Sequence, residues 1–408
     1  MSSLGEGENE YAAIFTTANK EITWEVPTDL VNVQFLVVGG GGGGGAISST
    51  QGGAGGGGGG VVTGIVNSLS RGQKIKLFVG KGGAGGTTTT ETTVSSRVGV
   101  DPDGDGTEYG VGGAYSGQDS YFAVDSVEYA RAYGGAGDPG AGFNGKLGGS
   151  NSGGRTTTAQ GTPKKGVIGA AAAENILNYK IFGNKGGVIA SGITRAAGGG
   201  GGATTAGSNA KTSSSYQIGG AGGEGVVSTI TGSEIVYGSG GAGGLRGNIV
   251  EGNMHGYGGS GGTGAGDGSG ESAKANQGGG GGGGTTYPKS ATTGSNALDW
   301  KPDAIIGGNG GSGIVVLRFS IPGADEKLKV DEVTALIKNY VYDGTEHTCG
   351  LSSTDVRYTI SGVTKATEVG TYTVTVTVNE KPVPPKENLT ISAAADPITV
   401  GEDAVIVV

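Results

Sequence analysis

The sequence predicts an all-β protein, in which a jelly-roll-like β-sandwich carries a large glycine-rich insertion and a second β module follows. Glycine accounts for 95 of 408 residues, against a usual share of about 7%, and so many glycines exclude long helices and coiled coils. Segments that alternate apolar and polar residues lie at both ends of the glycine-rich part. The composition changes near Pro322, since only 5 of the 95 glycines lie in residues 324–408.

The first strands of the sandwich are predicted over residues 11–16, 21–26, 31–38, 61–66 and 74–79. In EITWEV the apolar Ile22, Trp24 and Val26 alternate with polar residues, which is typical of a strand with one buried face. The next strand alternates in the same way, so the two are expected to form a β-hairpin. Residues 313–319, GIVVLRF, are apolar enough to be buried on both faces, and predict the returning strand that closes the sandwich.

The insertion, about residues 81–310, needs an interpretation of its own, as do the glycine runs at 39–45, 55–60, 198–202 and 278–284. One interpretation is a flexible linker. Apolar and aromatic residues interleave with the glycines, however, which is atypical of a disordered linker and favours a packed bundle of polyproline-II-like helices. Such a helix has three residues per turn and no internal hydrogen bonds, so its N–H and C=O groups point outward in three directions. Only glycine would let neighbouring helices approach closely enough to satisfy them.

Charge and hydropathy narrow the classes of partner. The formal net charge is −9, from 27 basic and 36 acidic residues, and the basic residues are scattered, so nucleic-acid binding is not expected. No apolar run approaches the roughly 18 residues that a membrane span needs, and the N-terminus lacks the basic and apolar regions of a Sec signal peptide. We therefore expect a location in a virion, or outside the cell or at its surface after export by another route, such as lysis. A single cysteine permits no disulfide within the chain.

Three segments carry a resemblance to the glycine-rich domain of bacteriophage tail-fibre and bacterial surface proteins: VPTDLVNVQFLVVGGGGGGGA, GGAGGGGGGVVTGIVNSLSRGQKIKLFVGKGGAGG and GGNGGSGIVVLRF. In that family a strand ends in a glycine run, and a GGxGGSGIVxxR strand closes the domain. A related layout, a sandwich interrupted by a polyglycine bundle, is known in the extracellular region of the anaplastic lymphoma kinase receptors. The resemblance covers about residues 20–320. It implies extracellular recognition and names no ligand.

The tail resembles a bacterial immunoglobulin-like module, on a YDGT turn at 342–345 and the strand GTYTVTVTV at 370–378. In that strand threonines alternate with Tyr372 and valines, which predicts one polar and one apolar face. After the spacer KPVPPKEN, the chain is typical of the opening strands of a further module, or of strands that pair with another subunit. The predicted domains are 1–323, 324–382 and 383–408.

Catalysis is not expected. His347 and Cys349 lie two residues apart, but two such side chains make neither a zinc site nor an oriented triad. The run at 39–45 follows a strand as a phosphate loop does, but it has no lysine and no following helix. The sequence thus predicts a protein that is not an enzyme and does not bind nucleotides.

A calcium site is one hypothesis for the segment DPDGDGTE. Asp101, Asp103 and Asp105 stand on alternate residues before Gly106, as in the first half of a calcium loop. Gly112 occupies the position where an EF-hand needs its bidentate glutamate, and Glu108 or Asp119 would have to replace it. The alternative is an acidic, solvated turn.

Tyrosines on glycine- and serine-rich loops are the candidate receptor-binding residues: Tyr115, Tyr216 and Tyr257. Tyrosine offers contact area at low entropic cost, and glycine and serine adapt around it; packing within the bundle is the alternative role.

We expect a structural and recognition protein of a bacteriophage, such as a tail or head fibre or adhesin, that binds a host cell-surface carbohydrate or outer-membrane protein. The alternatives are an extracellular filament or adhesin subunit of a bacterium and a capsid decoration protein. A homo-oligomer that contacts other virion or filament subunits is expected.

Overall fold

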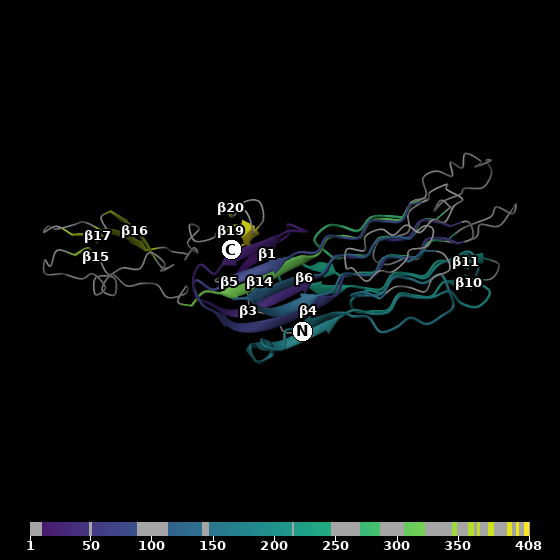
Figure 1. The fold of residues 1–408 in the computed structure, drawn as a ribbon, viewed down its shortest axis with the longest axis horizontal. Helices are drawn as coiled ribbons and strands as arrows, with labels where there is room; N and C mark the ends of the chain where they lie inside the picture. Colours follow the sequence, from purple (N-terminus) through teal and green to yellow (C-terminus); the bar gives the residue numbers. More distant parts are fainter. Residues whose placement is uncertain are drawn as a thin grey trace.

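Two antiparallel β-sheets and a bundle of extended segments that projects from them make up the main body of the protein (Figure 1). The computed structural model describes residues 10–48, 51–87, 113–140, 147–213, 216–245, 270–285, 306–322, 345–348, 358–362, 365–367, 374–378, 390–393, 397–399 and 404–407. Within these residues there is no α-helix, and the chain is all-β apart from one 3-10 turn, η1 (Ala173–Asn175). In the same described part, no helix has the length and apolar character needed to cross a membrane.

The first sheet has six strands, in the order β21 (Ala404–Val407), β1 (Glu10–Phe15), β14 (Ile314–Ser320), β3 (Leu30–Val38), β4 (Val61–Leu69) and β9 (Ile176–Phe182). Strand β14 lies between β1 and β3 and is antiparallel to both. The prediction that residues 313–319 return to close the sandwich is therefore confirmed.

The second sheet has seven strands, in the order β20 (Pro397–Thr399), β19 (Thr390–Ala393), β2 (Glu21–Glu25), β5 (Lys74–Phe78), β6 (Ser120–Val124), β7 (Val127–Ala132) and β8 (Gly166–Ile168). The predicted hairpin of residues 21–26 and 31–38 is wrong, because β2 pairs with β5 and β19, whereas β3 pairs with β4 and β14. The short connection between β2 and β3 crosses from one sheet to the other. The alternating pattern identifies the buried face of each of these two strands, and the two buried faces point into the same core.

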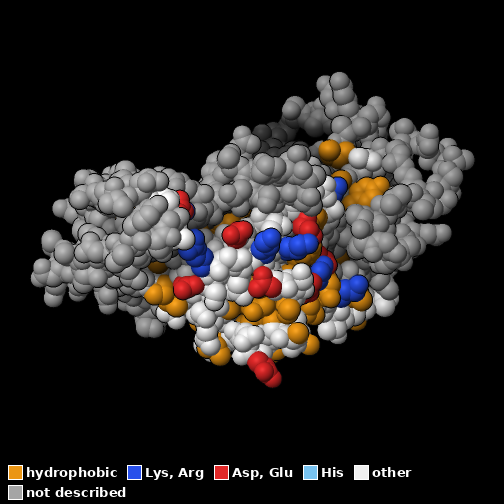
Figure 2. Space-filling model, turned by 60° about the vertical axis from the view of Figure 1, so that its left-hand side comes forward, with side chains coloured by type: hydrophobic (Ala, Val, Ile, Leu, Met, Phe, Trp, Pro, Cys, Tyr) orange, Lys and Arg blue, Asp and Glu red, His pale blue; other side chains and the backbone are white. Residues whose placement is uncertain are grey.

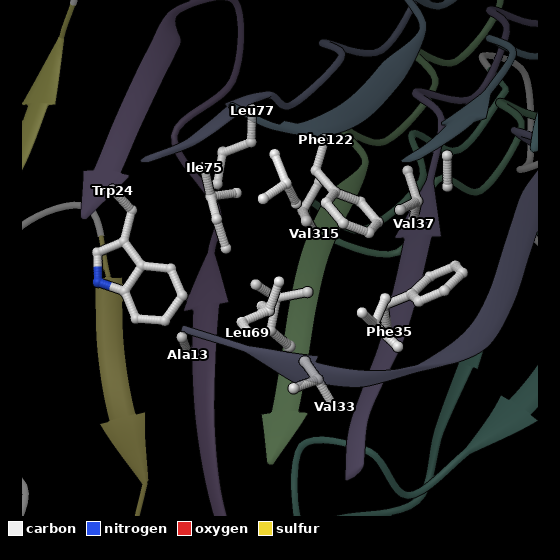
Figure 3. Close-up of a cluster of buried hydrophobic side chains, with 14 of the residues drawn as sticks. Ala13, Trp24, Val33, Phe35, Val37, Leu69, Ile75, Leu77, Phe122 and Val315 are labelled. Carbon is white, nitrogen blue, oxygen red and sulfur yellow. The ribbon is translucent and has the colours of Figure 1, made fainter. Parts of the chain in front are cut away.

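The core between the sheets is built from the alternating apolar residues (Figure 3). Trp24 and Phe122 come from the seven-stranded sheet, and Phe35 from the six-stranded sheet. The ring centroids of Phe35 and Phe122 are 5.2 Å apart, and those of Phe15 and Trp24 are 5.7 Å apart. Contacts between aromatic rings across the two layers therefore hold the sheets together.

A smaller core covers the outer face of the six-stranded sheet. The hairpin of β12 (Val226–Ser228) and β13 (Ile235–Tyr237) supplies Tyr237, which is fully buried against residues such as Leu36 and Val316. Burial raises the pKa of the Tyr237 hydroxyl above its ordinary value. Strand β14 is apolar on both faces because each face lies in a different core.

Four strands of the two sheets, β6 to β9, come from inside the predicted insertion of residues 81–310. The glycine-rich part is thus interrupted by strands that return to the sandwich, which the sequence pattern does not predict. The remaining described strands form three short antiparallel pairs: β10 (Lys211–Ser213) with β11 (Tyr216–Ile218), β15 (His347–Thr348) with β17 (Lys365–Ala366), and β16 (Tyr358–Gly362) with β18 (Val374–Val378).

The C-terminal strands are part of the two sheets of the sandwich. Strand β19 pairs with β2, and β21 pairs with β1. The expectation that this segment opens a further module is therefore not met. Its local β pattern was predicted, but the edges that receive it lie more than 360 residues away in the chain.

Candidate functional site at the end of the glycine bundle

The run Gly39–Gly45 shows how the bundle is built. The N–H groups of Gly39, Gly42 and Gly45 all donate to carbonyls of the segment 54–60, and the residues between them donate to the segments 115–118 and 308–311. The carbonyls of residues 40–45 accept hydrogen bonds from three further segments, 83–86, 135–138 and 281–284. Partners that repeat every third residue are typical of a polyproline-II-like helix. The run is thus an ordered helix surrounded by six others, and the prediction of a packed bundle is confirmed.

Close backbone contact explains why these positions are glycine. A Cβ atom added at Gly42 would overlap the carbonyl oxygen of Ala136, and one added at Gly281 would overlap that of Gly308. In both cases the obstacle is a backbone atom that already takes part in the network, so it cannot move aside cheaply. Glycine is required because of packing between helices, while its freedom to adopt unusual backbone angles is not needed here.

We expect the amides of this network to exchange slowly with solvent. The amide of Gly42 donates to Gly57 at 2.8 Å and that of Gly56 to Gly281 at 2.9 Å, inside the bundle. Hydrogen exchange followed by mass spectrometry should therefore show protection for minutes or longer in peptides covering residues 39–60. Complete exchange within seconds would contradict the ordered bundle.

The segments run away from the sandwich in one direction and end together (Figure 1). Gly39 follows β3 and Gly60 precedes β4, while the turn that joins their segments lies at the far end, where Gln51 N–H donates to Ser48 Oγ at 2.9 Å. Other segments also end there, since Gly86 N–H donates to the carbonyl of Gly44, near this turn. The far end of the bundle, away from the sandwich, therefore holds the turn that joins Ser48 and Gln51, with Gly86 beside it.

A buried ion pair joins three segments close to this end. Asp138 and Arg155 have fully buried side chains, and the guanidinium contacts Asp138 Oδ2 through both Nε, at 2.9 Å, and Nη2. The same carboxylate accepts hydrogen bonds from the amides of Ala54 and Gly140, both at 2.9 Å. Arg155 Nη2 also donates to the carbonyl of Ala46 at 2.8 Å. The pair thus fixes the turn at 46–54 against the segments that carry Asp138 and Arg155.

A small apolar cluster buries the end of the bundle beside β10 and β11. It consists of Ile189, Ile193, Ala196, Ala210 and Leu245. Thr285 Oγ1 donates to the carbonyl of Leu245 at 3.0 Å, which ties a further segment to the cluster. The end of the bundle therefore has a compact apolar cluster to which several segments are tied.

The structure places only some of the predicted site residues. Tyr115 lies in a bundle segment near the far end, where its amide donates to Ala84 and its carbonyl accepts from Gly43, each at 2.9 Å. The residue is 36% exposed. Tyr216 begins β11, so its backbone belongs to a strand and not to a loop. Tyr257 lies outside the described residues.

The acidic residues Asp101, Asp103 and Asp105 also lie outside the described residues, so the calcium site stays a prediction. Ala114, the second described residue after this segment, lies near the far end of the bundle, since its N–H donates to the carbonyl of Asp138. Among the residues that the structure describes, no group of three His, Cys, Asp or Glu side chains is arranged to hold a metal ion.

A second polar cluster lies on the outer face of the seven-stranded sheet. Arg131 pairs with Glu128 at 2.6 Å and with Asp119 at 3.3 Å, and its guanidinium lies 4.6 Å from the ring centre of Tyr121. Burial, together with the hydrogen bond to Glu21, raises the pKa of Tyr121. These groups bind one another, which indicates a role in stabilising the sheet. On the face shown in Figure 2, acidic and basic side chains are interspersed.

Asp138 and Arg155 are the residues that the sequence analysis missed. Each is a charged residue set among glycines, in GDPG and GGRT. The signal in the sequence was the presence of two oppositely charged residues in a segment that contains few other charged residues. Their pairing depends on which bundle segments become neighbours, which no local pattern records.

Comparison with known proteins agrees with this architecture. A family model described as a glycine-rich domain matches residues 16–320, about three quarters of the chain. The match ends with β14, the strand that closes the sandwich. No curated protein matches the chain.

Proposed function

The chain belongs to the glycine-rich domain family, and from this membership and the form of its bundle we propose that it is a structural and recognition protein of a bacteriophage particle, a tail or head fibre or an adhesin. The observation that carries the proposal is the common far end of the bundle, which holds turns and a partly exposed tyrosine away from the sandwich. The sandwich and the tail, which resembles an immunoglobulin-like module, then serve attachment and spacing. The proposal assigns no catalysis.

The ligand in this proposal is a host cell-surface carbohydrate or an outer-membrane protein. A rigid base loses little entropy when its loops bind, because the backbone hydrogen bonds already hold the segments in place. Several copies on one particle raise the effective concentration of the sites, so each site can be weak. This mode of binding explains why a stiff bundle is useful to an adhesin.

Binding of the labelled protein to a panel of intact bacteria tests the proposal. We expect capture by some strains, and we expect Tyr115→Ala to weaken it about tenfold, as for an aromatic contact residue. Tyr179→Ala is the matched control, because Tyr179 lies on β9 of the sandwich and is 51% exposed. The control should bind as the unchanged protein does, and both variants should keep its melting temperature. Equal loss in both variants, or capture by no strain, would contradict the adhesin function.

A second candidate function is an extracellular filament subunit of a bacterium or a capsid decoration protein. It is favoured by one observation, the C-terminal strands that complete the edges of both sheets. Strands added at an edge are a common means of joining subunits.

A further inference from the structure

Three neighbouring segments form one side of the glycine bundle: residues 81–87, 113–118 and 306–312. The carbonyl of Ala84, in the first of them, accepts from the amide of Tyr115 at 2.9 Å. The carbonyl of Gly83 accepts from the amide of Gly310, also at 2.9 Å. The segment 81–87 therefore lies between the other two. All three also bond to the central run 39–45, so they make a continuous surface on one side of it.

Every third residue of the middle segment faces outward. Lys81, Ala84 and Thr87 are exposed, whereas Gly83 and Gly86 are buried. A segment of this kind rises about 3.1 Å per residue, so successive outward residues are about 9 Å apart. Ala84 is the one small outward side chain, with a lysine before it and a threonine after it. The surface is therefore lowest at Ala84.

Larger residues stand on both sides of Ala84. Tyr115 is 36% exposed, and its backbone is held by hydrogen bonds to the segments on either side of it. Asn309 is also exposed, and its Oδ1 accepts from the amide of Gly85 at 2.8 Å. The carboxamide of Asn309 thus lies against the middle segment, one residue from Ala84. Tyr115, Ala84 and Asn309 together form a shallow depression, called here the Ala84 saddle.

The groups around the saddle suit an uncharged sugar. An aromatic ring has a negative face, which attracts the weakly positive C–H groups on the apolar face of a pyranose. Asn309 Nδ2 makes no hydrogen bond within the described part of the chain, so it can donate to a sugar hydroxyl. Lys81 is the one charged residue among the outward residues of the middle segment.

A protein ligand fits this surface less well. A protein interface is centred on a cluster of apolar and aromatic anchors that become fully buried. Near the saddle the described large apolar residues with exposed surface are Tyr115 and Ile306, the latter 42% exposed. Two such residues on a shallow surface can cover one sugar ring, but they do not make an anchor cluster.

We propose that the Ala84 saddle binds a hexose unit of an uncharged cell-surface polysaccharide. Ala84 leaves room for the sugar, the Tyr115 ring packs on its apolar face, and Asn309 donates to a hydroxyl. This inference rests on the proposed function and narrows its two classes of ligand to carbohydrate. Because a polysaccharide repeats the same unit, many copies of the protein on one particle can bind one chain, and each saddle can be weak.

Filling the saddle tests its position. Ala84→Ile places a stiff, branched side chain on the floor of the saddle, and we expect the variant to bind about tenfold more weakly to a bacterial strain that captures the unchanged protein. Ala206→Ile is the matched control, because Ala206 is also exposed and its segment bonds to 54–60 and not to 81–87. The control should bind normally, and both variants should keep the melting temperature.

Asn309→Asp tests the polar contact. The variant keeps the oxygen that accepts from Gly85 and loses the Nδ2 donor. We expect a loss of binding of about tenfold, as for one hydrogen bond to the ligand. Normal binding by Ala84→Ile and Asn309→Asp would place the site elsewhere and overturn the inference.

Treating the cells identifies the class of ligand. Periodate cleaves sugars at neighbouring hydroxyls, and a protease removes exposed outer-membrane proteins. We expect periodate to abolish capture and the protease to leave it unchanged, and we expect polysaccharide purified from the strain to compete for binding. Loss with the protease alone would overturn the inference and leave the adhesin function standing. Capture by no strain would contradict the proposed function itself, and the inference would fall with it.

Discussion

Replacing Gly281 with alanine is expected to lower the free energy of unfolding by about 3 kcal/mol, near the upper end of the usual cost of overpacking. The added methyl group would overlap the carbonyl oxygen of Gly308. Relief would require the segments to separate, which would strain the hydrogen bonds from Gly281 to Gly42 and from Gly56 to Gly281, both 2.9 Å. Chemical denaturation followed by circular dichroism, with the melting temperature as a second measure, gives the change.

Gly279→Ala is the matched control in the same run. The nearest atoms to its added methyl group would be Ala273 Cβ at 3.1 Å and Ser239 Oγ at 3.4 Å, both in side chains. We expect a loss below about 1 kcal/mol, because these neighbours can yield by a few tenths of an ångström. Equal losses at the two positions would show that backbone overlap is not what makes the run glycine.

Asp138→Ala is expected to lower the free energy of unfolding by about 3–5 kcal/mol, the usual cost of removing one partner of a buried ion pair. The change leaves the charge of Arg155 in a fully buried site without its carboxylate, and it removes the acceptor for the amides of Ala54 and Gly140. Hydrogen exchange at Ala54 should accelerate more than exchange within 39–42. Denaturant unfolding measures the loss of stability.

Asp119→Ala provides the comparison for this variant. Asp119 also pairs with an arginine, Arg131, and accepts one backbone hydrogen bond, from Gly134 at 3.0 Å, but its side chain is 35% exposed. Water can solvate what the change leaves behind, so we expect a loss of about 1 kcal/mol. A similar loss for both variants would mean that the buried pair does not hold the end of the bundle together.

The elements with a strong local period were predictable from the sequence. Strand β2 alternates in steps of two, and the glycine run at 39–45 can satisfy its backbone only through neighbours in three directions. Strands β8 and β12 escaped prediction because each has only three residues, too few to show a period. The sequence predicts a site made of exposed tyrosines, whereas the end of the bundle that carries this site depends on Asp138 and Arg155.

Local chemistry in the sequence alone determined the fold class, the ordered bundle and the strand that closes the sandwich. These follow from which groups each segment must bury or hydrogen-bond. Only the tertiary structure decided the partners: β2 and β3 in different sheets, the six neighbours of the central run, and the C-terminal strands on the β1 and β2 edges. The physical reason is that a strand or polyglycine segment presents nearly the same backbone donors and acceptors to any neighbour. The choice among neighbours depends on side-chain packing and charge between residues far apart in the chain.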